Sequence, residues 1–91
     1  MAIARNINRN SSRNMAVIGV RLLDDAHMTW VAAEIVSEQA LHAWFDAAAP
    51  RRAGAYLAYR AAVDREDAAA RDLQRLYELT EPYQEHLART Q

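Results

Sequence analysis

The stretch YLAYRAAVDREDAAARDLQRLYELT, residues 56–80, decides the fold because it reads as one long amphipathic helix. At 3.6 residues per turn, its apolar side chains gather on one side and its charged side chains on the other. The apolar side consists of Ala55, Tyr59, Ala62, Val63, Ala69, Ala70, Leu73, Leu76 and Tyr77. A side this long must be covered by another element.

Glu66 lies near the middle of that apolar side and is its only charged residue. A carboxylate in such a place needs a hydrogen-bond partner or water. We expect Glu66 to lie opposite Ala33 of a preceding helix, within reach of the Ser37 hydroxyl and the Trp30 indole N–H. Glu66 is either a functional carboxylate or a residue that fixes the register of two helices, as polar residues in helical seams do. We favour the second interpretation.

A preceding helix is predicted over residues 25–48. Asp24 and Asp25 supply N-cap oxygens and negative charge, and neither proline nor glycine follows until Pro50. The β-branched residues within 29–36 make a strand the alternative for that piece, but the alanines and the glutamate among them count against it.

Pro50 disfavours helical geometry at Ala49, so the first helix should end near residue 48 and the second should occupy residues 52–79. A link this short makes the two helices antiparallel neighbours. Facing residues should then have numbers that add to about 100, which places Trp44 beside Tyr56. The fold class is therefore all-α, an antiparallel helical hairpin in which small side chains of the first helix face large ones of the second.

The two ends of the chain are less regular. Residues 1–14 are rich in arginine and asparagine and should form an arm that is disordered on its own. Residues 15–23 are apolar and can be strand or helix; we favour a packing segment that meets the far end of the second helix, or an irregular first helical turn. Pro82 should interrupt that helix, and residues 83–89 should form a short C-terminal helix. Residues 15–91 then make one helical-hairpin domain.

Composition restricts the class of protein. The chain has 91 residues and no cysteine, so disulfide frameworks, thiolate metal sites and cysteine nucleophiles are excluded. Residues 1–23 carry four arginines and no acid (+4), whereas residues 24–91 carry seven arginines and all twelve acids (−5). The sequence offers neither a membrane-spanning run nor the apolar core of a signal peptide. We expect a cytoplasmic protein with no membrane contact.

A second apolar face lies on the first helix, and one hairpin partner cannot cover both faces. We therefore predict a non-catalytic protein that acts by protein–protein interaction. It would form a homodimer with a coiled-coil-like four-helix arrangement, or bind a larger protein as a small regulator or inhibitor. The predicted interface residues are Met28, Val31, Ile35, Phe45, Tyr59 and Tyr77.

The alternative function is nucleic-acid binding through the basic arm, where Arg5, Arg9 and Arg13 would contact phosphates. The aromatic residues offer a stacking platform for single strands, but at helical spacing on apolar faces we interpret them as core.

Catalytic and metal sites have little support in the sequence. Glu34, Glu38 and His42 follow one another at intervals of four residues, which aligns possible metal ligands on one helical stripe. The row lacks the Glu-x-x-His spacing of carboxylate-bridged metal sites, so we interpret it as a solvated face. With two glycines in the chain, glycine-rich phosphate loops are excluded. We predict no catalytic residue, no metal and no cofactor.

Overall fold

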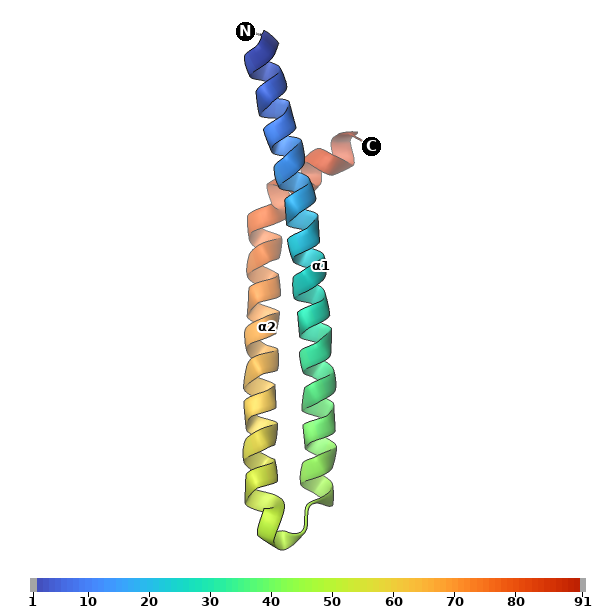
Figure 1. Cartoon of the computed structure of the whole chain (residues 1–91), viewed down its shortest axis with the longest axis vertical. Helices are drawn as coiled ribbons and strands as arrows, with labels where there is room; N and C mark the ends of the chain where they lie inside the picture. The colour runs from blue at the N-terminus through green and yellow to red at the C-terminus, as the bar shows by residue number, and fades with distance from the viewer. Residues whose placement is uncertain (1, 91) are drawn as a thin grey trace.

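The computed structural model of the chain is a hairpin of two long α-helices that pack side by side (Figure 1). It describes the backbone of residues 2–90 and the side chains of residue 11 and residues 13–82. Helix α1 spans Ala2–Asp46, and helix α2 spans Ala49–Thr90. The prediction of an all-α antiparallel hairpin is confirmed.

The hairpin is long and thin, with extents of 73 × 19 × 14 Å. Its radius of gyration is 20.3 Å, whereas a compact domain of this length would have one of about 12 Å. Among the described residues, the buried apolar ones are Ala16, Leu23, Ala62 and Ala69, and no large side chain is fully buried. Two helices meeting along one line therefore give the molecule a seam and leave it without an enclosed core.

The link between the helices consists of Ala47 and Ala48 alone. The Ala47 N–H donates to the Trp44 carbonyl at 3.2 Å, and the Arg51 N–H donates to the Ala48 carbonyl at 2.9 Å. Pro50 lies in the first turn of α2, where its missing N–H would have had no partner within the helix. The predicted end of the first helix is two residues late, and the predicted start of the second is three residues late.

The predicted start of the first helix near Asp25 is wrong, because α1 runs from Ala2 without a break. The Asp25 carbonyl accepts a hydrogen bond from the Thr29 hydroxyl at 3.0 Å in the middle of this helix. Residues 15–23 and 29–36 are both helical. Whether residues 1–14 are disordered on their own stays a prediction; the backbone from residue 2 continues α1, and nearly all their side chains lie outside the described part.

Gly19 explains how the apolar segment joins the hairpin. A Cβ atom added to Gly19 would lie 3.0 Å from Thr80 Cγ2 and 3.3 Å from Thr80 Cβ. Ala16 and Leu23, one turn to either side, are buried. The far end of α2 therefore packs directly on this part of α1, where a glycine leaves room for Thr80 although it weakens the helix by about 1 kcal/mol relative to alanine.

Pro82 lies inside α2, whose bounds extend to Thr90. Figure 1 shows the last turns of α2 leaving the axis of the rest of the helix. A proline inside a helix removes one backbone hydrogen bond and its ring crowds the preceding turn, which bends the helix. The Thr80 hydroxyl also donates to the Leu76 carbonyl at 2.6 Å just before the bend. The predicted end of the second helix at residue 79 is therefore wrong, because α2 continues through Pro82. A separate C-terminal helix over residues 83–89 is not shown.

The seam between the helices follows a seven-residue repeat with alternating steps of three and four. Every position in the repeat is buried or half-buried. The spacing is typical of a left-handed coiled coil. In α1 the seam residues are Ala16, Gly19, Leu23, Ala26, Trp30, Ala33, Ser37, Ala40 and Trp44, and in α2 they are Ala55, Tyr59, Ala62, Glu66, Ala69, Leu73, Leu76 and Thr80.

The predicted register is confirmed at both ends of the seam. The Trp44 and Tyr56 ring centroids lie 4.9 Å apart near the turn, and Gly19 meets Thr80 at the other end. Facing residues thus have numbers that add to about 99, close to the predicted 100. In this register the α1 seam presents glycine or alanine at every second position, so the helices can approach closely and larger residues of α2 fill the space.

Candidate functional site

Aromatic residues form a cluster beside the turn. The Trp44 ring stacks on Tyr59, with centroids 5.6 Å apart and 19° between planes, and it meets Tyr56 at 55°. Phe45 stacks on the outer side of Trp44 at 5.6 Å. Tyr59 is half-buried in the seam, so it supports the hairpin itself, although the sequence suggested an interface role.

Glu66 occupies a half-buried seam position. Ser37, on the facing helix, is buried, and its Oγ atom has no hydrogen-bond partner. The expected hydrogen bond between Ser37 and Glu66 is therefore not formed. In the register of the seam, Trp30 lies one layer away, opposite Ala69, and its indole ring tilts against His27 at 5.8 Å. Glu66 thus lies in the seam, as the sequence predicted, but Ser37 is not its partner.

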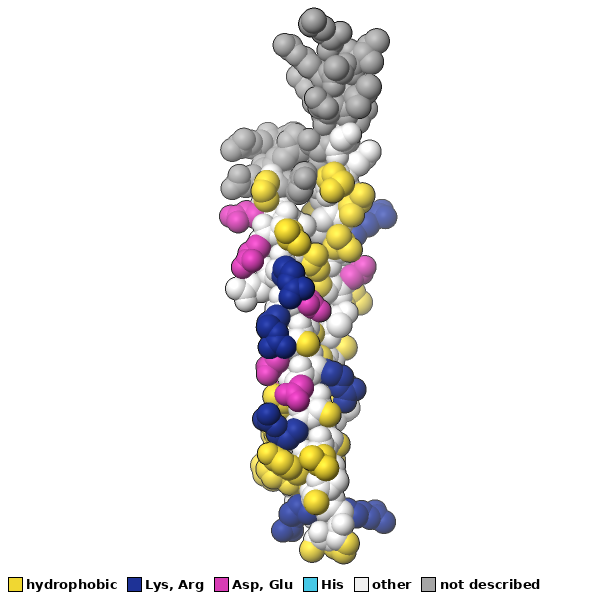
Figure 2. All heavy atoms as spheres, turned by 90° about the vertical axis from the view of Figure 1, so that its left-hand side faces the viewer, with side chains coloured by type: hydrophobic (Ala, Val, Ile, Leu, Met, Phe, Trp, Pro, Cys, Tyr) yellow, Lys and Arg dark blue, Asp and Glu magenta, His cyan; other side chains and the backbone are white. Residues whose placement is uncertain are grey.

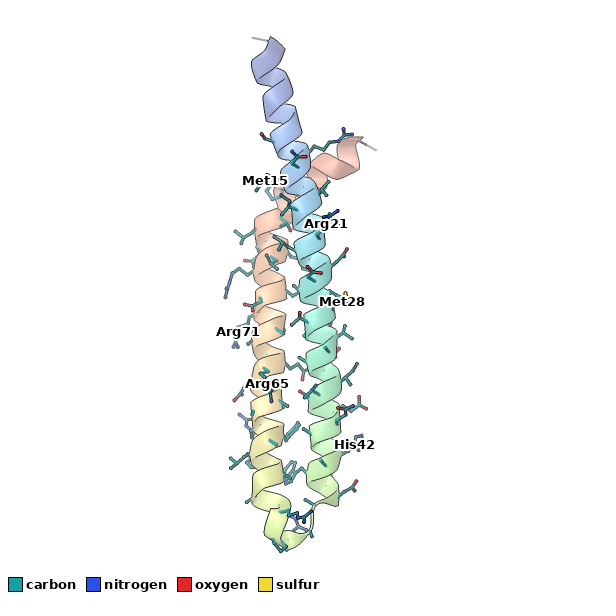
Figure 3. The ribbon with its side chains drawn as sticks, in the orientation of Figure 1. Met15, Arg21, Met28, His42, Arg65 and Arg71 are labelled. Carbon is teal, nitrogen blue, oxygen red and sulfur yellow. The ribbon has the colours of Figure 1, made fainter. Side chains whose placement is uncertain are left out.

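The second apolar face predicted from the sequence is on the outside of α1. Met28, Ile35 and Phe45 are exposed by 68%, 50% and 69%, and Val31 between them is half-buried. Figure 3 shows Met28 and His42 on the side of α1 that points away from α2. We call Met28, Val31, Ile35 and Phe45 the outer strip. No segment of the described hairpin covers it.

Tyr77 lies on one flank of the hairpin, between the seam and the outside. With Trp30, Ala70, Leu73, Gln74 and Glu78 it lines a hollow of about 290 Å³. Tyr77 is half-exposed, at 51%. It lies on a surface separate from the outer strip, and its interface role stays a prediction.

The opposite flank carries a groove that the sequence reasoning missed. One hollow of about 410 Å³ is lined by Leu22, Asp25, Ala26, Thr29, Ala69, Asp72, Arg75 and Leu76. A second, of about 160 Å³, is lined by Ala32, Ala33, Val36, Ala62 and Arg65. We call this surface the groove flank. The signal that identifies it is a third row of α1 residues spaced three and four apart, which includes Met15, Ile18, Leu22, Thr29, Ala32 and Val36.

Exposed hydrophobic side chains are most crowded at the open end of the hairpin, opposite the turn. Met15, Val17, Ile18, Val20 and Leu22 are all exposed by 38% or more. They point to different sides of α1 because they occupy nearly consecutive positions. Figure 2 shows hydrophobic side chains gathered near this end, whereas arginines and acids spread along the outside of α2. A helix that is apolar on all sides is typical of a buried segment.

The charged residues form surface pairs. Glu38 Oε1 and His42 Nε2 are 4.0 Å apart, and both side chains are largely exposed. Arg60 pairs with Asp64 at 3.9 Å, and Arg75 pairs with Asp72 at 3.6 Å. Within the described residues, no three potential metal ligands come together. Exposed pairs of this kind contribute a few tenths of a kcal/mol each.

The arginines of the N-terminal segment are only partly described. The side chains of Arg5 and Arg9 lie outside the described residues, and Arg13 is exposed. Because the backbone is helical from Ala2, positions 5, 9 and 13 are each about one turn apart.

Comparisons of the chain with protein-family models, with curated proteins and with solved structures find no match. In the part of the chain that is described, neither helix has an apolar stretch long enough to cross a membrane. The surfaces of the hairpin are therefore the basis for any functional proposal.

Proposed function

We propose that the chain is a non-catalytic helical protein that works by protein–protein contact. It associates with a second copy of itself, binds a larger protein that it regulates or inhibits, or does both. A cytoplasmic location belongs to the same proposal.

The observation that supports this function is the imbalance between buried and exposed apolar surface. Thirteen large hydrophobic side chains are exposed among the described residues, while the buried apolar set is one leucine and three alanines. Monomeric soluble proteins rarely expose contiguous apolar patches larger than a few hundred Å², and the exposed side chains here gather in the outer strip and at the open end of the hairpin. A seam of small residues also supplies little stability, and small domains of this kind usually gain it from association.

The outer strip is the surface we assign to a larger partner. It presents Met28, Ile35 and Phe45 on one side of α1. An apolar helix face of this kind can bind in a hydrophobic groove of a partner or pack against a partner helix. Methionine and phenylalanine are enriched at protein interfaces. Tyr77 would extend contact on another flank, whereas Tyr59 is left out because it packs on Trp44.

Sedimentation of the purified chain tests the self-association part. We expect a dimer or larger species at micromolar concentration, and a melting temperature that rises with concentration because association stabilises the folded state. Capture from a native lysate tests the second part: Ile35→Glu should lose the partner, and Arg71→Glu, which changes the outside of α2, should retain it. A stable folded monomer that captures the same proteins with or without Ile35→Glu would contradict the proposal.

Nucleic-acid binding through Arg5, Arg9 and Arg13 is the alternative, supported by the helical backbone that spaces these arginines one turn apart. Three phosphate contacts would make the logarithm of the binding constant fall with the logarithm of salt concentration with a slope of about −2.7 for duplex DNA. Binding should disappear when residues 1–14 are deleted. Unchanged affinity of the shortened chain would exclude this function.

A further inference from the structure

The groove flank has two unlike rims. The α1 rim is mainly apolar, and Leu22 and Val36 on it are each 45% exposed. The α2 rim holds Arg65, Asp72 and Arg75. Between the rims, the floor is made by alanines of the seam. These small residues let the helices approach closely, but their side chains are too short to fill the groove between the two rims.

We propose that the groove flank is the surface through which two copies of the chain pack, side by side with their turns at the same end, into a four-helix bundle. This inference rests on the self-association part of the proposed function. It assigns that association to one surface and one orientation.

Complementary rims support a second copy as the occupant. A two-fold axis parallel to the helices places the α1 rim of one copy against the α2 rim of the other at the same height along the hairpin. The α2 row on this flank, in steps of three and four, consists of Arg65, Ala68, Asp72, Arg75 and Leu79. Residues at the same height within one copy have numbers that add to about 99 or 100, so the member of this row nearest in height to Leu22 is Leu79 of the second copy. Asp25 meets Arg75 of the second copy, and Ala32 meets Ala68.

The charges favour this orientation over the reversed one. If the second copy were turned end for end, the α1 rim would face another α1 rim. The row of α1 residues on this flank, from Met15 to Asp46 in steps of three and four, contains Asp25 and Asp46 but no basic residue. In the reversed orientation Asp25 would face only acidic or uncharged residues of the second copy. The proposed orientation instead brings Arg75 of the second copy toward Asp25, in addition to the Arg75 that lines the same hollow in its own copy.

The available area is sufficient for a stable dimer. Residues 15–46 of α1 span about 48 Å at 1.5 Å per residue. With a width of 19 Å, the flank offers about 900 Å², and a standard interface buries about 800 Å² on each partner. The outer strip lies on the other side of α1 and stays exposed in this dimer. The two surfaces can therefore act at the same time.

Cross-linking tests the proposal, because the chain has no cysteine of its own. Ala32→Cys and Ala68→Cys change exposed alanines and should leave the fold intact. Chains with Ala32→Cys, mixed with differently tagged chains with Ala68→Cys, should form a mixed disulfide under mild oxidation. The control pair is His42→Cys with Arg71→Cys, on the outer sides of the two helices (Figure 3). The groove pair should link about a thousandfold faster, since proximity raises the effective thiol concentration from about micromolar to about millimolar.

Sedimentation of the unmodified chain, run in parallel, separates the outcomes. A dimer whose 32–68 disulfide forms no faster than the control pair would overturn the groove assignment and leave self-association standing. Fast linking of Ala32→Cys chains to one another would show the reversed orientation and also overturn the proposal. A folded monomer at all concentrations would overturn both this inference and the self-association from which it starts.

Discussion

Single residues in the seam show where the hairpin is well matched and where it is not. Gly19 fits against Thr80 because it has no side chain. Ser37 is the opposite case, since its hydroxyl is buried and has no hydrogen-bond partner. A buried polar group without a partner costs about 1–3 kcal/mol. The seam therefore tolerates one polar residue at a position where alanine would fit.

Replacing Ser37 tests that cost. We expect Ser37→Ala to raise the free energy of unfolding by about 1 kcal/mol, because it removes an unpaired hydroxyl and increases helix propensity. Urea denaturation followed by circular dichroism, at one fixed protein concentration, would measure the change. Gln39→Ala, at an exposed position two residues away, is the control and should change stability by less than about 0.5 kcal/mol. A loss of stability in Ser37→Ala would mean that the hydroxyl has a partner in solution, with Glu66 the nearest carboxylate in the seam.

At the scale of the two helices, different kinds of side-chain contact hold the two ends of the seam together. Near the turn, Trp44 packs against Tyr56 and Tyr59. At the open end, the contacts are between small or aliphatic residues, with Leu23 facing the end of α2. Aromatic pairs add about 0.5–1.5 kcal/mol beyond their buried area. The turn end should therefore be the more stable part of the hairpin.

Truncating Trp44 tests that difference. Trp44→Ala should lower the free energy of unfolding by about 2–3 kcal/mol, less than for a fully buried tryptophan because Trp44 is half-buried. Leu57→Ala is the matched control: Leu57 is also near the turn but is 67% exposed, so its loss should be below about 0.5 kcal/mol. Equal losses in thermal or urea unfolding would show that the aromatic cluster does not stabilise the seam.

The sequence predicted the helices where their amphipathic pattern was long. The pairing of Trp44 with Tyr56 followed from a short link and a constant sum of residue numbers. The start of α1 was missed because residues 15–23 are apolar on all sides and contain Gly19, so the local pattern indicates no single face. That segment packs on α2, as the contact of Gly19 with Thr80 and the burial of Ala16 and Leu23 indicate, and such tertiary contacts cannot be read from a local pattern. The groove flank was missed because its floor belongs to the seam and only the packed pair reveals the hollow.

At the scale of the whole molecule, the long thin shape is one reason why we propose association as the function. Extents of 73 × 19 × 14 Å place nearly every residue near the surface. Pairing along the flank would add a second layer of helices and create an interior that the single hairpin lacks. Pairing by the ends would lengthen the particle without creating one.

Small-angle X-ray scattering distinguishes these two assemblies. Two copies packed along their groove flanks should keep a longest dimension within about 10 Å of the 73 Å of one hairpin, because neighbouring helices pack 8–10 Å apart. An end-to-end dimer would approach twice that length. The scattering should be measured on the dimer fraction from size-exclusion chromatography. A longest dimension close to twice that of one hairpin would contradict side-by-side packing.

The two-residue link between α1 and α2 also has a kinetic consequence. Trp44 and Tyr56, which are in contact near the link, are also close in the sequence. Gly19 and Thr80 are in contact too, but they are far apart in the sequence. Bringing distant segments together costs more loop entropy than bringing close ones together. The hairpin should thus form from the link between the helices toward its open end. Each pair of facing residues that forms shortens the loop that the next pair must close. Thermal fraying should run the same path backwards, beginning where Gly19 touches Thr80.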